Sequence, residues 1–207
     1  MSLAFRELFA IDGAFDGIPM AGRTDASIVR DAALRHAIRD DSPQLATFPD
    51  VYRRHLIGEL EKPGPRKGIM PGVRELLDTL APRDDVYLAL LTGNYEATAQ
   101  LKLEYFDLWR YFRCGAFGDA APERNHLLPK AIAQVVACGG PPVAAAQSVI
   151  IGDTPLDIAV ALAGGARSIG VATGSHSAEA LRAAGADVVF DDLSNTPTVI
   201  RVLGSFR

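Results

Sequence analysis

Short apolar runs alternate with helical stretches over the second half of the chain. The runs that predict strands are residues 86–91, 113–117, 148–151, 167–172 and 187–190, of which the second is the weakest. Helical spacing lies between them at residues 95–104, 125–137, 155–163 and 177–184, and glycine follows the last two. Because right-handed crossovers place each helix on a face of the sheet, this order predicts parallel βα units in a three-layer α/β sandwich.

The first sixty residues have a different pattern. Helical periodicity appears near residues 26–37 and 47–60, and no convincing strand accompanies it. We therefore expect a small helical cap within residues 1–62. Residues 63–70 are rich in Pro and Gly, so they are predicted to be an irregular linker to a core spanning residues 71–207.

Composition and charge limit the kinds of partner that we expect the protein to bind. The chain has 207 residues, 48% of them hydrophobic, and its net charge of −4 is spread without long runs of one sign. Nothing in this distribution indicates binding to nucleic acid or to a membrane, and no apolar window has the length of a membrane span. The two cysteines, Cys114 and Cys138, indicate reduced packing residues rather than a disulfide framework. We expect a cytoplasmic protein that acts on a small molecule.

Polar residues follow the first predicted strand directly. Thr92, Gly93 and Asn94 come after the apolar run and open a helix. Open parallel sheets bind ligands at the carboxyl ends of their strands, and such a corner offers a hydroxyl and backbone N–H groups to a phosphate oxygen. The alternative interpretation is an ordinary helix N-cap.

Two carboxylates follow the third predicted strand. Asp153 lies at the strand tip, and Asp157 comes four residues later in the first turn of a helix. Oxygen ligands at such a place suit Mg²⁺, which takes one or two carboxylates and leaves its other positions to water and substrate phosphate. The alternative is that Asp153 caps the helix and Asp157 only favours its positive end.

These segments together resemble the haloacid dehalogenase (HAD) superfamily. An apolar run ending in Thr-Gly-Asn, then a basic residue, then an apolar run ending in Gly-Asp-x-x-x-Asp is similar to motifs two, three and four of that family, over nearly the whole chain. The resemblance implies a Rossmann-like core, a helical cap, bound Mg²⁺ and an aspartyl nucleophile that forms a phospho-enzyme. It assigns the transferring phosphoryl group to Thr92 and the metal to Asp153, supported by Asp157.

The basic residue of the third motif has two candidates. Arg124 lies in the loop before a predicted helix, whereas Lys130 lies inside that helix after a proline. A loop position fits the family better, although the family usually has Lys followed by Pro, so Lys130 stays open as the alternative. Either residue is otherwise a solvated surface charge.

The first family motif, DxDGT, has no counterpart in the chain. The nearest similarity runs from Phe9 to Phe15, but there Ala10 takes the place of the nucleophile and Asp12 that of the acid/base, and alanine cannot form an acyl phosphate. Residues 3–9 instead have helical spacing and are interpreted as the end of the first core helix. We thus expect the nucleophile and the central first strand to be absent, with roughly twenty residues before the present start.

The segment that enters the cap resembles phosphoglycolate-phosphatase-like members of the family. In that register Arg23 and Thr24 face the substrate, although a loop with a Thr helix cap explains them equally well. The sequence predicts a Mg²⁺-dependent phosphatase of small phosphorylated metabolites, impaired by the absent nucleophile. A non-catalytic phosphate- and metal-binding protein is the alternative, and a dehalogenase or phosphomutase fits less well. A homodimer is a further possibility.

Overall fold

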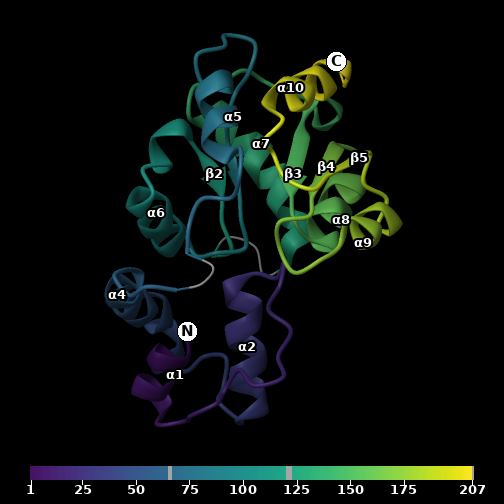
Figure 1. Ribbon diagram of the computed structural model, residues 1–207. Helices are drawn as coiled ribbons and strands as arrows, with labels where there is room; N and C mark the ends of the chain where they lie inside the picture. The colour runs from purple at the N-terminus through teal and green to yellow at the C-terminus, as the bar shows by residue number, and fades with distance from the viewer. Residues whose placement is uncertain (65–66, 120–122, 207) are drawn as a thin grey trace.

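The computed structural model describes residues 1–64, 67–119 and 123–206. Figure 1 shows two parts, a small group of helices that contains α1, α2 and α4, and an α/β core that contains the strands and the C-terminus. Pro65 and Arg66 of the expected linker lie outside the described residues, as do Ala120 to Pro122 before the third motif. Within the described part of the chain, no helix is long and apolar enough to cross a membrane.

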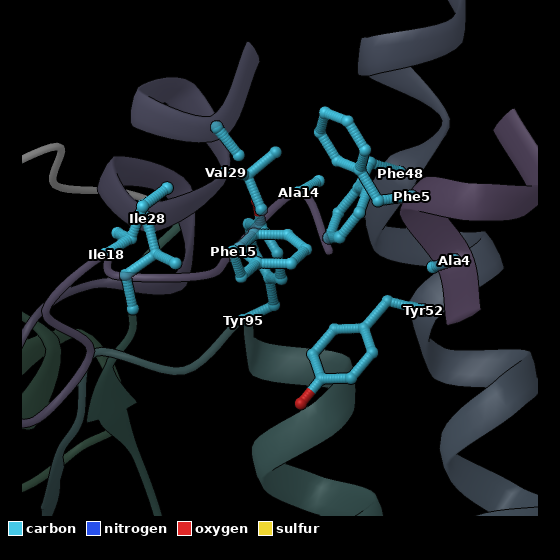
Figure 2. Close-up of a cluster of buried hydrophobic side chains, with 11 residues drawn as sticks. Ala4, Phe5, Ala14, Phe15, Ile18, Ile28, Val29, Phe48, Tyr52 and Tyr95 are labelled. Carbon is cyan, nitrogen blue, oxygen red and sulfur yellow. The ribbon is translucent and has the colours of Figure 1, made fainter. Parts of the chain in front are cut away.

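The N-terminal helices pack around an aromatic cluster and are called the cap below, after the expectation from the sequence. They are α1 (Ser2–Phe9), α2 (Asp25–Arg35), α3 (Pro43–Ala46) and α4 (Phe48–Leu60). The rings of Phe5, Phe15 and Phe48 meet in its centre, and the Phe5 and Phe15 rings form an edge contact with 5.4 Å between centroids (Figure 2). Helix α1 thus packs among the cap helices, whereas the sequence placed residues 3–9 at the end of a core helix.

The core strands are parallel and form two separate sheets. Strands β1 (Leu90–Leu91) and β2 (Gly115–Ala116) make one pair, and β3 (Val149–Gly152), β4 (Arg167–Val171) and β5 (Val188–Phe190) make the other sheet in that order. The prediction of a parallel α/β core is confirmed. Residues 86–89 were expected to extend the first strand, but among the described residues they have no partner strand and are not assigned to one.

Apolar side chains at the unpaired edges of β1 and β3 are partly exposed to solvent. Ile151 of β3 is 37% exposed, and Leu90 and Leu91 of β1 are only half-buried. Strands inside a parallel sheet are normally buried on both faces. Among the described residues, positions 1–20 contain a helix and turns but no strand, so they do not fill this place.

Helices connect and cover the strands. They are α5 (Val73–Leu80), α6 (Glu96–Tyr105), α7 (Leu127–Ala137), α8 (Pro155–Gly164), α9 (Ala178–Ala183) and α10 (Thr196–Ser205), with short 3₁₀ turns at Trp109–Tyr111, Arg124–His126 and Ala145–Gln147. Helix α8 shows how local residues set the two ends of a helix. Thr154 caps it, Pro155 occupies its first turn, and Gly165 ends it with a φ of 72°.

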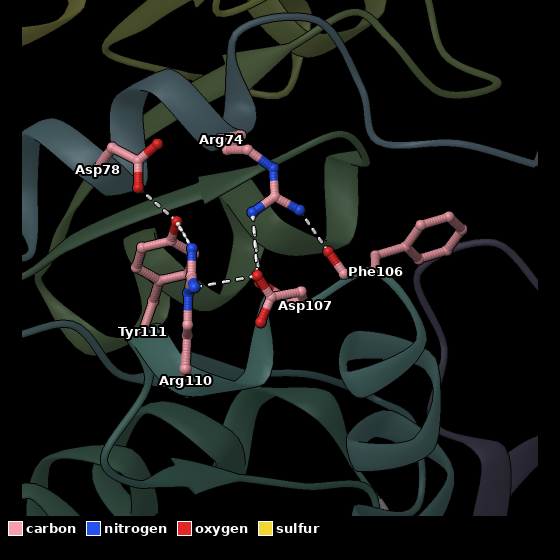
Figure 3. A network of polar contacts seen from close by, with 6 residues as sticks. All are labelled: Arg74, Asp78, Phe106, Asp107, Arg110 and Tyr111. Carbon is pink, nitrogen blue, oxygen red and sulfur yellow. Dashed lines mark hydrogen bonds and ion pairs between the residues drawn. The ribbon is translucent and has the colours of Figure 1, made fainter.

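A polar network joins α5 to the turn after α6. Arg74 donates to the Phe106 carbonyl and pairs with Asp107 at 3.6 Å, while Arg110 pairs with the same carboxylate at 3.0 Å (Figure 3). The Tyr111 hydroxyl donates to Asp78 and accepts from Arg110 Nη2 at 3.0 Å. These contacts fix the segment that leads from α6 into β2.

Replacing Tyr111 by phenylalanine is expected to lower the free energy of unfolding by about 0.5–1.5 kcal/mol, because a hydroxyl that both donates and accepts is lost. Urea denaturation measures the change. Tyr105→Phe is the matched control, since its ring is 41% exposed and contacts Lys67 through its face. An equal loss in both variants would show that the network adds nothing.

Candidate active site

A cavity of about 320 Å³ lies where the loops after β1 and β3 meet the cap. It collects most of the residues that the sequence singled out. Those among its lining are Arg23, Thr92, Gly93, Asn94, Arg124 and Asp153. Residues from four distant segments therefore share one site, as expected for the carboxyl ends of parallel strands.

The turn after β1 is held from both sides. The Thr92 N–H donates to Ala116 O at 3.0 Å on the neighbouring strand, and the Thr92 hydroxyl accepts from Asn94 N at 3.2 Å. The Gly93 carbonyl accepts from Asp25 N of the cap at 2.7 Å. A Cβ at Gly93 would collide with the Arg23 carbonyl and lie 3.0 Å from Arg124 Nη1, so only glycine allows this close approach.

Arg124 and Asp157 form a buried ion pair beside the cavity. Their side chains are 14% and 6% exposed. The second Asp157 oxygen accepts from Thr154 N at 3.0 Å and from Thr154 Oγ1 at 2.9 Å, which closes the N-terminus of α8. The Arg124 Nε is buried and has no hydrogen-bond partner among the described residues, so this guanidinium keeps an unused donor.

Of the two carboxylates that follow β3, Asp153 and Asp157, Asp153 is the one that lies at the cavity. It lines the cavity, and burial followed by the nearby Asp157 charge raises its pKa. A Cβ at Gly174 would collide with its carboxylate, so the loop after β4 packs closely against it. Such an oxygen ligand is compatible with Mg²⁺, which can use one carboxylate together with water and phosphate. Asp157, expected as a second ligand, has both oxygens engaged by Arg124 and Thr154, and the described residues contain no group of three or more acidic, His or Cys ligands.

The two expected cap residues have structural partners. Arg23 Nη2 pairs with Asp31 Oδ2 at 2.8 Å, and its Nη1 donates to the Pro19 carbonyl at 3.2 Å. Thr24 is 1% exposed, and its hydroxyl accepts from Ser27 N at 3.2 Å as the N-cap of α2. Arg23 borders the cavity, whereas Thr24 is not part of its lining.

Lys130 and Asp12 lie elsewhere. Lys130 is exposed and borders a separate cavity of about 590 Å³, which Cys114 and Cys138 also line as free thiols. Asp12 has an 82% exposed side chain paired with Arg6 at 3.5 Å, and Ala10 ends α1 with a φ of 56°. Of the two candidates for the basic residue, the structure brings Arg124 to the cavity.

Asp25 and Lys102 were not singled out from the sequence, yet both line the cavity. Asp25 begins α2 and is 4% exposed. Lys102 follows Tyr95, Thr98 and Ala99 at helical spacing, and those three side chains are buried. A lysine on the buried stripe of a helix is the signal that could have revealed this position.

The ionisation of Asp25 is expected to lower the free energy of unfolding as pH rises. Burial raises the pKa of Asp25 above 3.8, against hydrogen bonds from Tyr95 N and Asn94 and the charge of Lys102 that lower it. The folded protein then holds this proton more tightly than the unfolded chain, so ionisation costs stability above the unfolded pKa. The difference in unfolding free energy between wild type and Asp25→Asn should therefore decrease from about pH 4 to pH 7. The exposed Asp50→Asn is the control, and a difference that rises with pH would contradict this sign.

Comparisons with known proteins find similar phosphatases and a family match over part of the chain. The HAD-hydrolase-like family model matches residues 124–196. Phosphoglycolate phosphatase of Pseudomonas fluorescens is 29% identical over 174 residues, which cover 84% of this chain and 57% of the relative. The probable phosphatase IndB of Dickeya dadantii is 28% identical over 197 residues, covering 94% and 78%. The chain thus spans little more than half the length of the first of these relatives.

Solved structures show the same fold. A predicted phosphoglycolate phosphatase from Haemophilus somnus superposes with a TM-score of 0.64 at 17% identity, covering 96% of this chain and 88% of its own. CbbY of Rhodobacter sphaeroides, solved in complex with phosphate, gives 0.64 at 20% identity, covering 93% and 87%. The fold is that of the HAD hydrolases, with a Rossmann-like arrangement. In sequence and in fold, the chain is similar to phosphatases of the HAD superfamily.

Proposed function

We propose that the protein acts on small organic phosphate monoesters as a Mg²⁺-dependent phosphatase. The observation that supports this most is the convergence of Thr92, Arg124 and Asp153 from three separate loops on one small cavity. A hydroxyl, a guanidinium and a carboxylate are the groups needed to hold a phosphoryl group and a divalent cation.

Each of these residues has a distinct role in the proposal. The Thr92 hydroxyl and the Arg124 guanidinium bind phosphoryl oxygens, and Asp157 holds this guanidinium in place. Asp153 holds Mg²⁺, which when bound neutralises charge on the phosphoryl oxygens. Asp157 acts through Arg124 and Thr154 rather than as a direct metal ligand.

The nucleophile is the open part of the mechanism. A phospho-aspartate needs a carboxylate in line with the ester bond. The described cavity is lined by the carboxylates of Asp25 and Asp153; Asp25 accepts from Tyr95 N at 3.0 Å, and Asp153 is assigned to the metal. We therefore propose that this chain binds its substrate but turns it over slowly. The alternative function is non-catalytic binding of phosphate and metal. It is favoured because neither Asp25 nor Asp153 is left to act as the nucleophile.

Two measurements separate these functions. Hydrolysis of an aryl phosphate and of phosphoglycolate, the compound named in several relatives, is followed with Mg²⁺ and with excess chelator. Calorimetry measures binding of inorganic phosphate under the same conditions. Mg²⁺-dependent turnover supports the phosphatase; binding without turnover supports the binding protein; neither binding nor turnover overturns both. If an added upstream strand ending in D-x-D-G restores turnover, the expected absence of the nucleophile is correct.

A further inference from the structure

The cap side of the cavity contains a basic side chain that has no ionic partner among the described residues. Three basic side chains line this cavity, those of Arg23, Lys102 and Arg124. Arg23 pairs with Asp31 at 2.8 Å, and Arg124 pairs with Asp157. Lys102 has no carboxylate within ion-pair distance among the described residues; its ammonium donates to Asn94 Oδ1 at 2.9 Å.

A chain of hydrogen bonds holds Lys102 in this place. Asn94 Nδ2 donates to Asp25 Oδ1 at 3.4 Å, and the other Asp25 oxygen accepts from Tyr95 N at 3.0 Å. Because the Asn94 amide gives its donor to Asp25, its oxygen is left to accept from Lys102. An ammonium has three donors, so two remain after this bond and are available at the cavity.

The surroundings of Lys102 favour an anionic ligand over solvent. Burial lowers its pKa, and the Asp25 charge opposes that change. Tyr52 lines the same side of the cavity, and Figure 2 shows its hydroxyl pointing away from the aromatic cluster. A partly buried cation that lacks an ionic partner gains most from a ligand that brings a negative charge.

We propose that Lys102 is a specificity-determining residue that binds a second anionic group on the organic part of the substrate. This inference rests on the proposed phosphate-binding function, with Thr92 and Arg124 at the phosphoryl end and Lys102 at the cap end. It defines the substrates as small phosphate monoesters with a carboxylate or another phosphate close to the ester oxygen. Lysine binds either group as a point charge, so the test must separate them.

Binding of phosphonates tests the proposal without turnover, since they have no ester bond to hydrolyse. Phosphonopropionate carries a carboxylate, ethylenediphosphonate carries a second phosphonate at that place, and hydroxypropylphosphonate carries a neutral hydroxymethyl group. Calorimetry with Mg²⁺ should show at least one charged ligand binding roughly 10- to 100-fold tighter than the neutral one. Whichever charged ligand binds tighter identifies the second group.

Substitution of Lys102 should remove this preference alone. Lys102→Met is expected to bring the charged and neutral ligands within about threefold of each other, whereas Lys102→Arg retains the charge and most of the preference. Lys62→Met is the matched control, because Lys62 is exposed and pairs with Glu59 outside the cavity. Circular dichroism and thermal unfolding verify that the variants fold.

The outcomes distinguish this inference from the function on which it rests. If inorganic phosphate and all three phosphonates fail to bind wild type, the proposed function falls and this inference with it. If phosphate binds but wild type does not prefer a charged ligand, only the role of Lys102 is wrong. The role of Lys102 is also wrong if folded Lys102→Met binds all three phosphonates equally more weakly than wild type does. It is wrong as well if the preference for a charged ligand is unchanged in that variant.

Discussion

Replacing Asp153 by asparagine is expected to lower Mg²⁺-dependent hydrolysis by roughly 10²- to 10³-fold, the size of effect known for loss of a single charge-stabilising group. Asn keeps the shape of the side chain but removes the negative charge that would hold the metal. Because activity of this chain is expected to be low, Mg²⁺-dependent binding of inorganic phosphate serves as a second measurement.

The stability of the same variant should change in the opposite direction. Burial and the charge of Asp157 raise the pKa of Asp153, so its ionised form is costly in the folded protein. Asp153→Asn is then expected to unfold at the same or a slightly higher temperature. The exposed Asp84→Asn is the control for loss of one charge. Retained Mg²⁺ dependence in Asp153→Asn would remove the metal assignment, while a large loss of stability would show a structural role.

Local signals in the sequence account for much of the core. Each predicted strand corresponds to an observed one, because an apolar run bounded by turn residues needs only its own composition to be recognised. Helix α8 was located by Pro155 at its start and glycine after its last turn, both local features, whereas its cap is Thr154 and not Asp153, the cap that the sequence offered as an alternative. Helix α10 was not predicted, although Asn195 caps it and Pro197 lies in its first turn.

Features that depend on contacts between distant residues were harder to predict from the sequence. Whether residues 86–89 count as strand depends on a neighbouring strand that the described chain does not provide. The packing of α1 depends on Phe48, forty-three residues after Phe5, which periodicity does not show. The site follows the same rule: Thr92 and Asp153 were found by their positions after apolar runs, whereas Asp25 of α2 and Lys102 of α6 meet at the cavity only in the folded chain.

Asp157 shows how one residue can be located correctly and still have an unexpected partner. Its spacing from Asp153 indicated a second metal ligand, but its carboxylate caps α8 through Thr154 and pairs with Arg124. Arg124 comes from a segment thirty-three residues earlier, so the sequence interval carried no sign of the pair. The proposed metal site therefore depends on Asp153, and the proposed phosphate-binding geometry depends on Asp157.

Replacing Asp157 by alanine is expected to destabilise the protein by about 3–5 kcal/mol, because it leaves the Arg124 charge buried without its partner and removes the Asp157 half of the capping box of α8. Chemical denaturation measures this loss. Phosphate binding should weaken as well, since Arg124 would no longer be held at the cavity.

A double variant separates the ion pair from the cap. Arg124→Met removes the stranded charge, so Arg124→Met with Asp157→Ala should recover part of the stability lost in Asp157→Ala. Thr154→Ala, which removes only the hydroxyl, should cost about 0.5–2 kcal/mol. If the double variant is less stable than Asp157→Ala by the full effect of Arg124→Met, the two charges act independently and Asp157 does not position Arg124. Recovery in the double variant, with phosphate binding still lost, would instead show that the pair exists to hold the guanidinium for the substrate rather than to stabilise the fold.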